Sequence, residues 1–413
     1  MAISSPLSFG QLSLWRNIEN SSESQRGEVN LVHVWKVPAG PSTEDVVIAL
    51  HSLSLRHEAL RTTLEVQYGT EPRQIIAPSA VADFEVLRVA AGEEHLAVEA
   101  TVARLDFHPF NILSDAPWKA VVIVSQGRPT DVVVTVHHIA ADFWALGLLG
   151  ADFRKLLKGP ITETAPTPRD LAAEQRGPSW DKKRRAVRSY FHKIYSAADG
   201  GGGLPSSGVP VKASLHSGVA LQGARELAAH LGITVPSVIL AALGKAAADA
   251  IGVRTYLLNT MCANRFQSRD KNLVVSMNQW VPIICQAGQG RSFEESAQEI
   301  HRATLMAYRH GRYNPDERAE IREQLFPGGT PQPAEFHFNF TPNSSAGIAP
   351  DPTNMVRVVR ERPSRTIGPR FMVAASEFGD LLVTARTMLD GFSEDHLVEY
   401  LTSVNNILSR YTV

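Results

Sequence analysis

Two kinds of hydrophobic pattern follow one another along this chain. Residues 29–37 alternate apolar and polar side chains as a half-buried β-strand does. Ser42 then precedes a helical pattern of apolar residues, namely Val46, Val47, Leu50 and Leu53. A last amphipathic helix is predicted to begin at Ser393. Because strands and helices are mixed in both halves of the chain, the pattern predicts an α+β fold.

Two β-hairpins are predicted where short apolar runs flank turn residues. The runs Ala120–Val124 and Val132–His137 lie on either side of the turn-rich sequence Gln126–Thr130. Near the C-terminus, residues 371–375 and 381–387 flank a second turn in the same way. Each pair of runs is expected to form antiparallel strands.

The clearest break in the pattern lies between Gly159 and Gly208, where prolines, a charged helix and a run of glycines come together. A chain of 413 residues also favours two lobes over one. We therefore predict an N-terminal lobe at 1–177 and a C-terminal lobe at 178–413. The second would include a mobile glycine-rich linker near 199–208.

The most informative stretch is the strand that ends in two adjacent histidines. His137, His138 and Asp142 form the pattern HHxxxD. Successive side chains of a strand point to opposite faces, so one imidazole can face a cavity while its neighbour is held by the surrounding structure. This geometry favours a single general base over a metal site built from both histidines. Asp142 precedes a helix-like run, where its carboxylate could cap the helix or form an ion pair.

HHxxxD resembles the active-site motif of nonribosomal peptide synthetase condensation domains, within the wider chloramphenicol-acetyltransferase-like superfamily. Other stretches are similar to motifs of that family and occur in the expected order. Pro6–Trp15 looks like the first motif, Arg56–Leu64 matches the second closely, and Met261–Arg265 resembles the Asn-Arg segment. The resemblance covers nearly the whole chain.

The resemblance implies two acetyltransferase-like lobes packed as a V-shaped pseudo-dimer, with an active-site tunnel between them. It implies that His138 faces this tunnel and either removes a proton from the nucleophile or mainly positions it. His137 is then structural. Asp142 is expected to pair with an arginine of the second lobe, for which Arg265 is the match.

Four residues are candidates for the tunnel wall, namely Phe143, Asn278, Gln279 and Trp280. Phe143 stands where the family usually has glycine, so its ring either narrows a substrate channel or packs into the core beside Trp144. Alignment of the later motif on Pro282 places Gln279, not Asn278, at the usual asparagine position. Trp280 either lines the pocket or packs in a core, as aromatic residues in strands commonly do.

Composition excludes several other classes of protein. The net charge of −1 gives no basic footprint for nucleic acid. Two cysteines are too few for a disulfide framework and show no zinc spacing, and we expect no bound metal. The absence of a signal-like N-terminus, and of any run of roughly 18 apolar residues, predicts a cytoplasmic protein without a membrane span.

The residues and the resemblance together predict an acyltransferase. It would transfer an acyl group from the phosphopantetheine thioester of an acyl or peptidyl carrier protein to an amine, giving an amide, or to a hydroxyl, giving an ester. The acceptor would be free or carrier-bound, and the chain itself would bind no cofactor. The alternative is a catalytically silent condensation-like module that recruits carrier proteins or tailoring enzymes, although recruitment would not need a base at His138.

Overall fold

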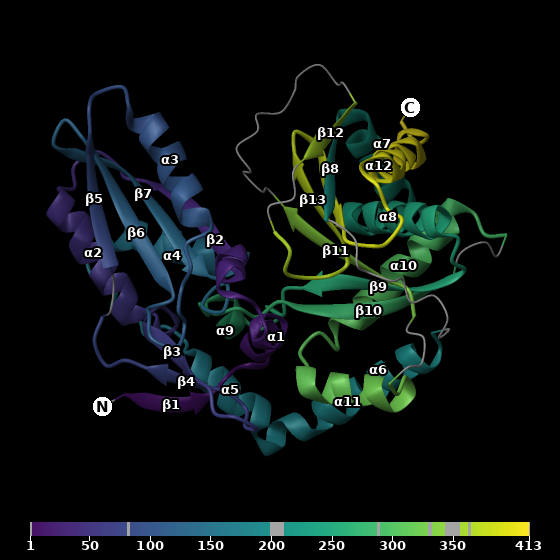
Figure 1. Ribbon diagram of the computed structural model, residues 1–413, viewed down its shortest axis with the longest axis horizontal. Helices are drawn as coiled ribbons and strands as arrows, with labels where there is room; N and C mark the ends of the chain where they lie inside the picture. Colours follow the sequence, from purple (N-terminus) through teal and green to yellow (C-terminus); the bar gives the residue numbers. More distant parts are fainter. Residues whose placement is uncertain are drawn as a thin grey trace. The chain divides into compact units, whose positions relative to one another are not determined.

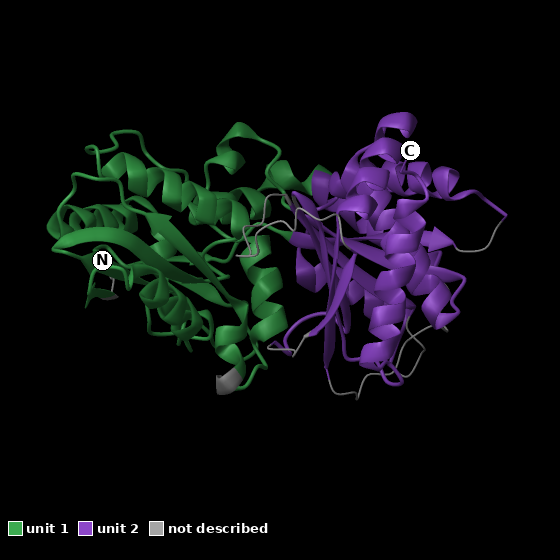
Figure 2. Ribbon diagram, turned by 90° about the horizontal axis from the view of Figure 1, so that it is seen from above, with its two compact units in different colours: residues 1–182, 263–278 green, residues 183–262, 279–413 purple. Residues whose placement is uncertain are grey.

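The computed structural model describes residues 2–80, 83–198, 210–286, 290–328, 333–342, 356–361 and 365–412. The chain forms two compact units (Figure 2). Unit 1 comprises residues 1–182 and Ala263–Asn278, and unit 2 comprises Lys183–Cys262 and Gln279–Val413. The predicted boundary at 177/178 is therefore corrected, because a segment from the second half of the chain belongs to unit 1. The expected glycine-rich linker near 199–208 lies outside the described residues.

Unit 1 combines a four-stranded sheet, a three-stranded sheet and the helices around them (Figure 1). Its strands are β1 (Ile3–Pro6), β2 (Asn30–Lys36), β3 (Thr62–Glu65), β4 (Arg73–Ile76), β5 (Asp83–Val89), β6 (Trp118–Ser125) and β7 (Arg128–His137). Its α-helices are α1 (Phe9–Ile18), α2 (Thr43–Arg56), α3 (Glu94–Asp106), α4 (Phe143–Leu156), α5 (Pro168–Arg176) and the short α9 (Ser268–Lys271). Three 3-10 helices lie at Glu23–Val29, Glu58–Arg61 and Pro178–Trp180.

The larger sheet of unit 1 has the order β2-β7-β6-β5 and is covered on both faces. Val132, Val134 and Val136 of β7 pack in one core with residues of α2 and α4. Val133 of the same strand packs in a separate core with Leu105 of α3. Each residue of β7 points to the opposite face of the sheet from its neighbour. The sheet is therefore the middle layer, with α2 and α4 on one face and α3 on the other.

Unit 2 is built on a seven-stranded mixed sheet of order β10-β9-β11-β13-β14-β8-β12. Its strands are β8 (Val211–Ser217), β9 (Thr255–Cys262), β10 (Gln279–Gln286), β11 (Glu335–Pro342), β12 (Arg357–Glu361), β13 (Phe371–Phe378) and β14 (Asp380–Thr387). Its helices are α7 (Gly218–Leu231), α8 (Val235–Ile251), α10 (Phe293–Tyr308), α11 (Pro315–Leu325) and α12 (Glu394–Ser409), and α6 (Asp181–Ser196) begins at the boundary. Strands and helices share one large apolar core.

Local sequence explains where several elements begin and turn. Ser42 caps α2 in a capping box with Asp45, and Ser393 caps α12 at the predicted position. The predicted hairpins are confirmed as β6–β7 and β13–β14, both antiparallel. Gln126 and Gly127 have φ values of 51° and 75°, the left-handed conformation that a two-residue hairpin turn needs. The prediction of an α+β fold is confirmed.

No single described helix combines the length and the apolar character of a membrane span. The pair α7 and α8, bent by 113° at their junction, passes that test by length and composition only. Both helices contribute buried side chains to the core of unit 2.

The segment Ala263–Asn278, here called the crossover segment, connects β9 to β10. These strands pair antiparallel in unit 2, with Cys262 opposite Gln279, so the two ends of the segment start from adjacent positions. Asn264 opens the segment with a φ of 58°, a conformation that asparagine tolerates better than most residues. Its side-chain amide donates to the Met277 carbonyl oxygen at 2.8 Å, which closes the base of the segment. The crossover segment is therefore a closed loop that packs within unit 1.

Candidate active site

The two histidines of the HHxxxD pattern lie in different environments. β7 ends at His137, which is buried with 2% of its surface exposed. His138 begins the turn that follows and is half-buried. The strand is thus one residue shorter than the alternation argument assumed, but the difference in exposure between the two imidazoles agrees with it.

His137 has the contacts of a structural residue. Its Nδ1 accepts a hydrogen bond from the backbone N–H of Ile139 at 3.2 Å, and its ring packs edge-on against Phe110. Burial, with a smaller contribution from the neighbouring His138, lowers the pKa of His137 to about 3. His137 is therefore neutral near pH 7 and stabilises the turn that presents His138.

Asp142 is the N-cap of α4 and makes three buried contacts. Its Oδ1 accepts from the Ala145 backbone N–H at 2.8 Å and from Arg265 Nη2 at 2.7 Å. Its Oδ2 accepts from the Met277 backbone N–H at 3.1 Å. One carboxylate therefore caps the helix and holds the crossover segment, so both of the roles that the sequence suggested, helix cap and ion pair, are present.

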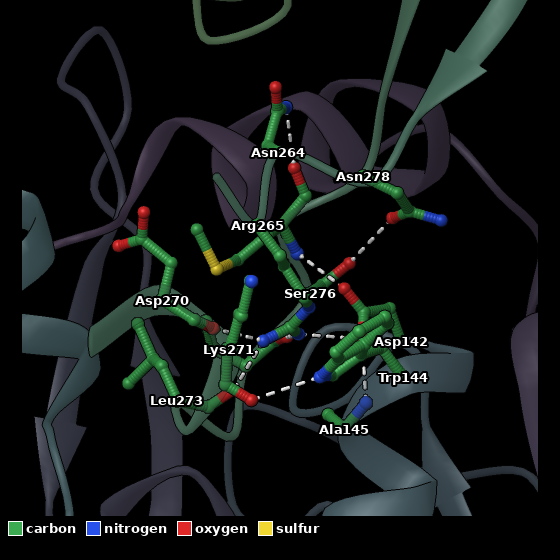
Figure 3. A network of polar contacts seen from close by, with 12 residues as sticks. Asp142, Trp144, Ala145, Asn264, Arg265, Asp270, Lys271, Leu273, Ser276 and Asn278 are labelled. Carbon is green, nitrogen blue, oxygen red and sulfur yellow. Dashed lines mark hydrogen bonds and ion pairs between the residues drawn. The ribbon is translucent and has the colours of Figure 1, made fainter. Parts of the chain in front are cut away.

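Arg265 is the ion-pair partner of Asp142, and its guanidinium organises the crossover segment (Figure 3). Nη1 donates to the carbonyl oxygens of Asp270 and Leu273, both at 2.7 Å, and Nη2 also donates to that of Val275 at 3.0 Å. The charge is buried, but these oxygens and the carboxylate replace the water that it loses. The pair lies wholly within unit 1, which corrects the expectation that the arginine comes from the second lobe.

Two further contacts tie the crossover segment to its surroundings. The indole N–H of Trp144, in the first turn of α4, donates to the Lys271 carbonyl oxygen at 2.9 Å (Figure 3). Leu273, Val275 and Met277 form a small apolar cluster with Leu171 of α5. Polar and apolar contacts together therefore fix the position of residues 271–277.

Ser276 is the site residue that the sequence analysis missed. It is buried, and its Oγ lies 3.4 Å from His138 Nδ1 and 3.2 Å from Asn278 Oδ1. A signal was present, because Ser276 is the one polar residue in the run Leu273–Met277. The structure thus places His138, Ser276 and Asn278 together, beside the Asp142–Arg265 pair.

Gly10 of α1 is required by the close approach of the crossover segment. A Cβ atom at this position would lie against the Ser276 carbonyl oxygen and 2.8 Å from Met277 Cα. We expect Gly10→Ala to lower the free energy of unfolding by about 1–3 kcal/mol, because the backbone must shift to admit the methyl group. Urea unfolding measures this change.

Gly147→Ala is the matched control, since Gly147 also lies within a helix but an added Cβ atom would meet nothing within 4 Å beyond its own helix. This variant should leave the free energy of unfolding unchanged or raise it by up to about 1 kcal/mol through helix propensity. Equal losses in the two variants would contradict the proposed close packing at Gly10.

The segment Arg56–Leu64 positions α4 rather than supplying a reactive group. His57 Nε2 lies 3.1 Å from Asp152 Oδ2, and Arg56 Nε donates to the same oxygen at 2.9 Å. Burial raises the pKa of Asp152, but hydrogen bonds from His57 and Arg56 outweigh it, so the pKa is well below its usual range. Burial also lowers the pKa of His57. These contacts anchor the C-terminal half of the helix whose N-terminus is capped by Asp142.

The four residues that were candidates for the tunnel wall lie in different environments. Phe143 is 44% exposed, so it does not pack into the core beside Trp144, which is 47% exposed. Gln279 belongs to unit 2, where its carboxamide bonds both the N–H and the carbonyl oxygen of Tyr313. Trp280 is half-buried in unit 2 and packs edge-on against His337. Asn278 accepts a hydrogen bond from the Ser276 hydroxyl.

The two cysteines are poorly placed to act as nucleophiles. Cys262 and Cys285 are buried free thiols, and burial raises the pKa of Cys285 to about 12. Among the described residues, no group of three or more His, Cys, Asp and Glu side chains is arranged to hold a metal ion.

The condensation-domain family model matches residues 5–317. The chain belongs to the condensation-domain family. This region includes the HHxxxD pattern and the whole crossover segment, which are joined by the ion pair of Asp142 and Arg265. Condensation domains of this family act in nonribosomal peptide and polyketide systems.

Individual relatives agree with this assignment. The phosphinothricin tripeptide synthetase PhsC of Streptomyces viridochromogenes is 25% identical over 326 residues, which are 73% of this chain and 29% of PhsC. The chain thus spans less than a third of that relative's length, and smaller shares of other curated synthetases.

Two solved structures show the same fold. One describes condensation domain-mediated chain release from the enacyloxin polyketide synthase: its TM-score is 0.79 at 17% identity, over 99% of this chain and 82% of that one. The other is the X-domain in complex with OxyB from teicoplanin biosynthesis, with a TM-score of 0.74 at 18% identity over 98% of this chain and 93% of that one. At these identities the likeness establishes the fold alone.

Proposed function

We propose that this condensation domain transfers an acyl group from a phosphopantetheine thioester on a carrier protein to an amine, forming an amide. The observation that carries the proposal is the half-buried His138, which follows the buried His137 and lies with its Nδ1 3.4 Å from Ser276 Oγ of the crossover segment. Ester formation with a hydroxyl acceptor is the closest variant of the same chemistry. We place this reaction in the cytoplasm, with no cofactor bound by the chain itself.

The proposed step needs one proton acceptor. The amine nitrogen attacks the thioester carbonyl carbon, a carbon–nitrogen bond forms, and His138 takes the proton that the nitrogen loses. The carbon–sulfur bond then breaks, and the phosphopantetheine thiol leaves with that proton. The acyl group passes directly to the acceptor, so no covalent enzyme intermediate is required, in line with the buried thiols of Cys262 and Cys285.

Intact-protein mass spectrometry of candidate acyl-loaded carrier proteins, mixed with this protein and an acceptor, tests the proposal. We expect a carrier-bound thioester to react with a much higher kcat/KM than the same acyl group on a short pantetheine mimic. The reason is that contacts with the carrier, remote from the reacting atoms, can position the thioester.

Equal efficiency with the two donors would exclude carrier recognition and favour a small-molecule acyltransferase. If the protein shows no turnover but binds a carrier protein or a tailoring enzyme tightly, the result would favour the catalytically silent recruiting module. That alternative has one supporting observation, the shared fold of the X-domain that was solved with OxyB.

Phe143 is proposed to restrict one substrate, since its ring is exposed at the start of α4 and one residue from Asp142. We expect Phe143→Gly to widen the range of accepted donors or acceptors more than it changes the rate with the preferred pair. A panel of acyl groups and amines measures this profile, with Tyr68→Gly as a control at another exposed aromatic of unit 1. An unchanged substrate profile would leave Phe143 without a role in selection.

A further inference from the structure

Unit 2 contains a small pocket between two of its helices and one end of its sheet. The volume of this pocket is about 150 Å³, and its walls come from α8, β9, β10 and α10, which lie together in unit 2 (Figure 1). The apolar side chains that line it are Ala241, Ile284, Phe293, Ile300 and Ala303. An apolar cavity of about 150 Å³ holds a single benzene ring. The pocket is therefore suited to one six-membered ring.

The deep end of the pocket requires no polar group from a ligand. Tyr256 of β9 lies directly opposite Cys285 of β10, and the hydroxyl and the thiol are hydrogen-bonded to each other. Only 3% of Tyr256 and 7% of Cys285 are exposed. Because these two polar groups are partners of one another, the buried part of a ligand is best apolar.

The charged side chains lie at the mouth of the pocket. Lys245 of α8 pairs with Asp249 at 2.8 Å. Arg291, which precedes α10, pairs with Glu299. Both pairs are exposed, and exposed ion pairs are weak, so either cation can turn towards an incoming anion. Two cations and one carboxylate, that of Glu299, line the pocket, and this balance favours an anionic ligand over a cationic one.

We propose that this pocket binds a small aromatic carboxylate, with its ring against the apolar walls and its carboxylate at Lys245 and Arg291. An apolar interior with a few polar groups that fix orientation is typical of small-molecule sites. The pocket is remote from the crossover segment. Tyr256 lies near one end of β9 and Cys262 at the other, where the segment begins, and the strand between them spans about 20 Å.

Ligand-observed fluorine-19 NMR with 4-fluorobenzoate tests the proposal. We expect a dissociation constant of about 1 mM or lower, in the range for a ligand of about ten non-hydrogen atoms. 4-Fluorobenzylamine carries a similar ring and the opposite charge, so it should bind at least about tenfold more weakly. Absence of 4-fluorobenzoate binding, or equal binding of the acid and the amine, would overturn the inference.

Substitutions in the wall locate the bound ring. Ser296→Leu and Ala303→Leu each place a larger side chain in the pocket and should abolish binding of 4-fluorobenzoate. Gln298→Leu is the matched control, since Gln298 belongs to the same helix but does not line the pocket, and its dissociation constant should equal that of the wild type. Unaltered binding by a folded Ser296→Leu protein would contradict this location.

Lys245→Met tests the charge without disturbing the core, because the Lys245 side chain is 51% exposed. Loss of one exposed ionic contact should raise the dissociation constant of 4-fluorobenzoate about fivefold. Lys193→Met, at an exposed lysine of α6 in the same unit, should leave it unchanged. A Lys245→Met protein that binds as tightly as the wild type would contradict the proposed place of the carboxylate. None of these binding measurements requires acyl transfer.

Discussion

Replacement of His138 with alanine is expected to slow acyl transfer by about 10²- to 10⁴-fold, the range that a well-placed general base supplies. The side chain is half-buried, so the fold and the binding of the carrier protein should be largely retained. Single-turnover rates with a loaded carrier protein measure the first effect, and circular dichroism with carrier titration checks the second.

His137→Ala is the matched control for this experiment. His137 is buried and its Nδ1 accepts from the Ile139 backbone, so its loss should lower stability and activity to comparable degrees. A folded His138→Ala protein with wild-type turnover would contradict the assignment of His138 as the general base.

Either Asp142→Ala or Arg265→Ala is expected to lower the free energy of unfolding by about 3–5 kcal/mol, because each leaves a buried partner charge without compensation. The double variant should recover part of this loss. Urea unfolding of the four proteins in a double-mutant cycle gives the coupling free energy. Activity should fall in all three variants, since the crossover segment that carries Ser276 is no longer anchored.

Glu85 and Arg104 provide the comparison pair. Their ion pair spans 2.8 Å in the same unit, but the side chains are 40% and 50% exposed, so its removal should cost about 1 kcal/mol or less. If the losses in the free energy of unfolding of the two single variants, Asp142→Ala and Arg265→Ala, simply add in the double variant, the contact between the two side chains contributes no stability of its own.

The sequence predicted those elements whose signals are local. The β6–β7 hairpin and the start of α12 follow from turn residues and a capping serine, and both lie where expected. The α+β class follows from the same mixture of local patterns. Family resemblance added Arg265 as the partner of Asp142, which lies 123 positions away and which no periodicity could have identified.

The membership of the crossover segment could not be predicted from the sequence. Its apolar run Leu273–Val275 gives no sign in the sequence of which core receives it. That choice depends on the carboxylate of Asp142 and on the missing side chain at Gly10, both distant in sequence. The prediction of a single boundary between the two units, at 177/178, was therefore wrong.

The sequence also could not show that Asn278 and Gln279, which are neighbours in the later motif, belong to different units. Asn278 ends the crossover segment, whereas Gln279 is the first residue of β10 and bonds the backbone of Tyr313. One step along the chain changes the unit to which a residue belongs. The alignment on Pro282 could not reveal this change, because it compares residue types and not the end of a strand.

The discontinuity of unit 1 has a consequence for the order of events during synthesis. Domains generally fold as they emerge from the ribosome, N-terminal part first. Here the first 182 residues emerge with Asp142 still lacking Arg265 and with Leu171 still exposed, because their partners lie in Ala263–Asn278. Unit 1 can complete its core only after β9 has been translated and the crossover segment has left the exit tunnel. A nascent chain stalled before residue 263 should therefore be readily digested by protease, and one stalled well beyond residue 278 should resist digestion across residues 1–182.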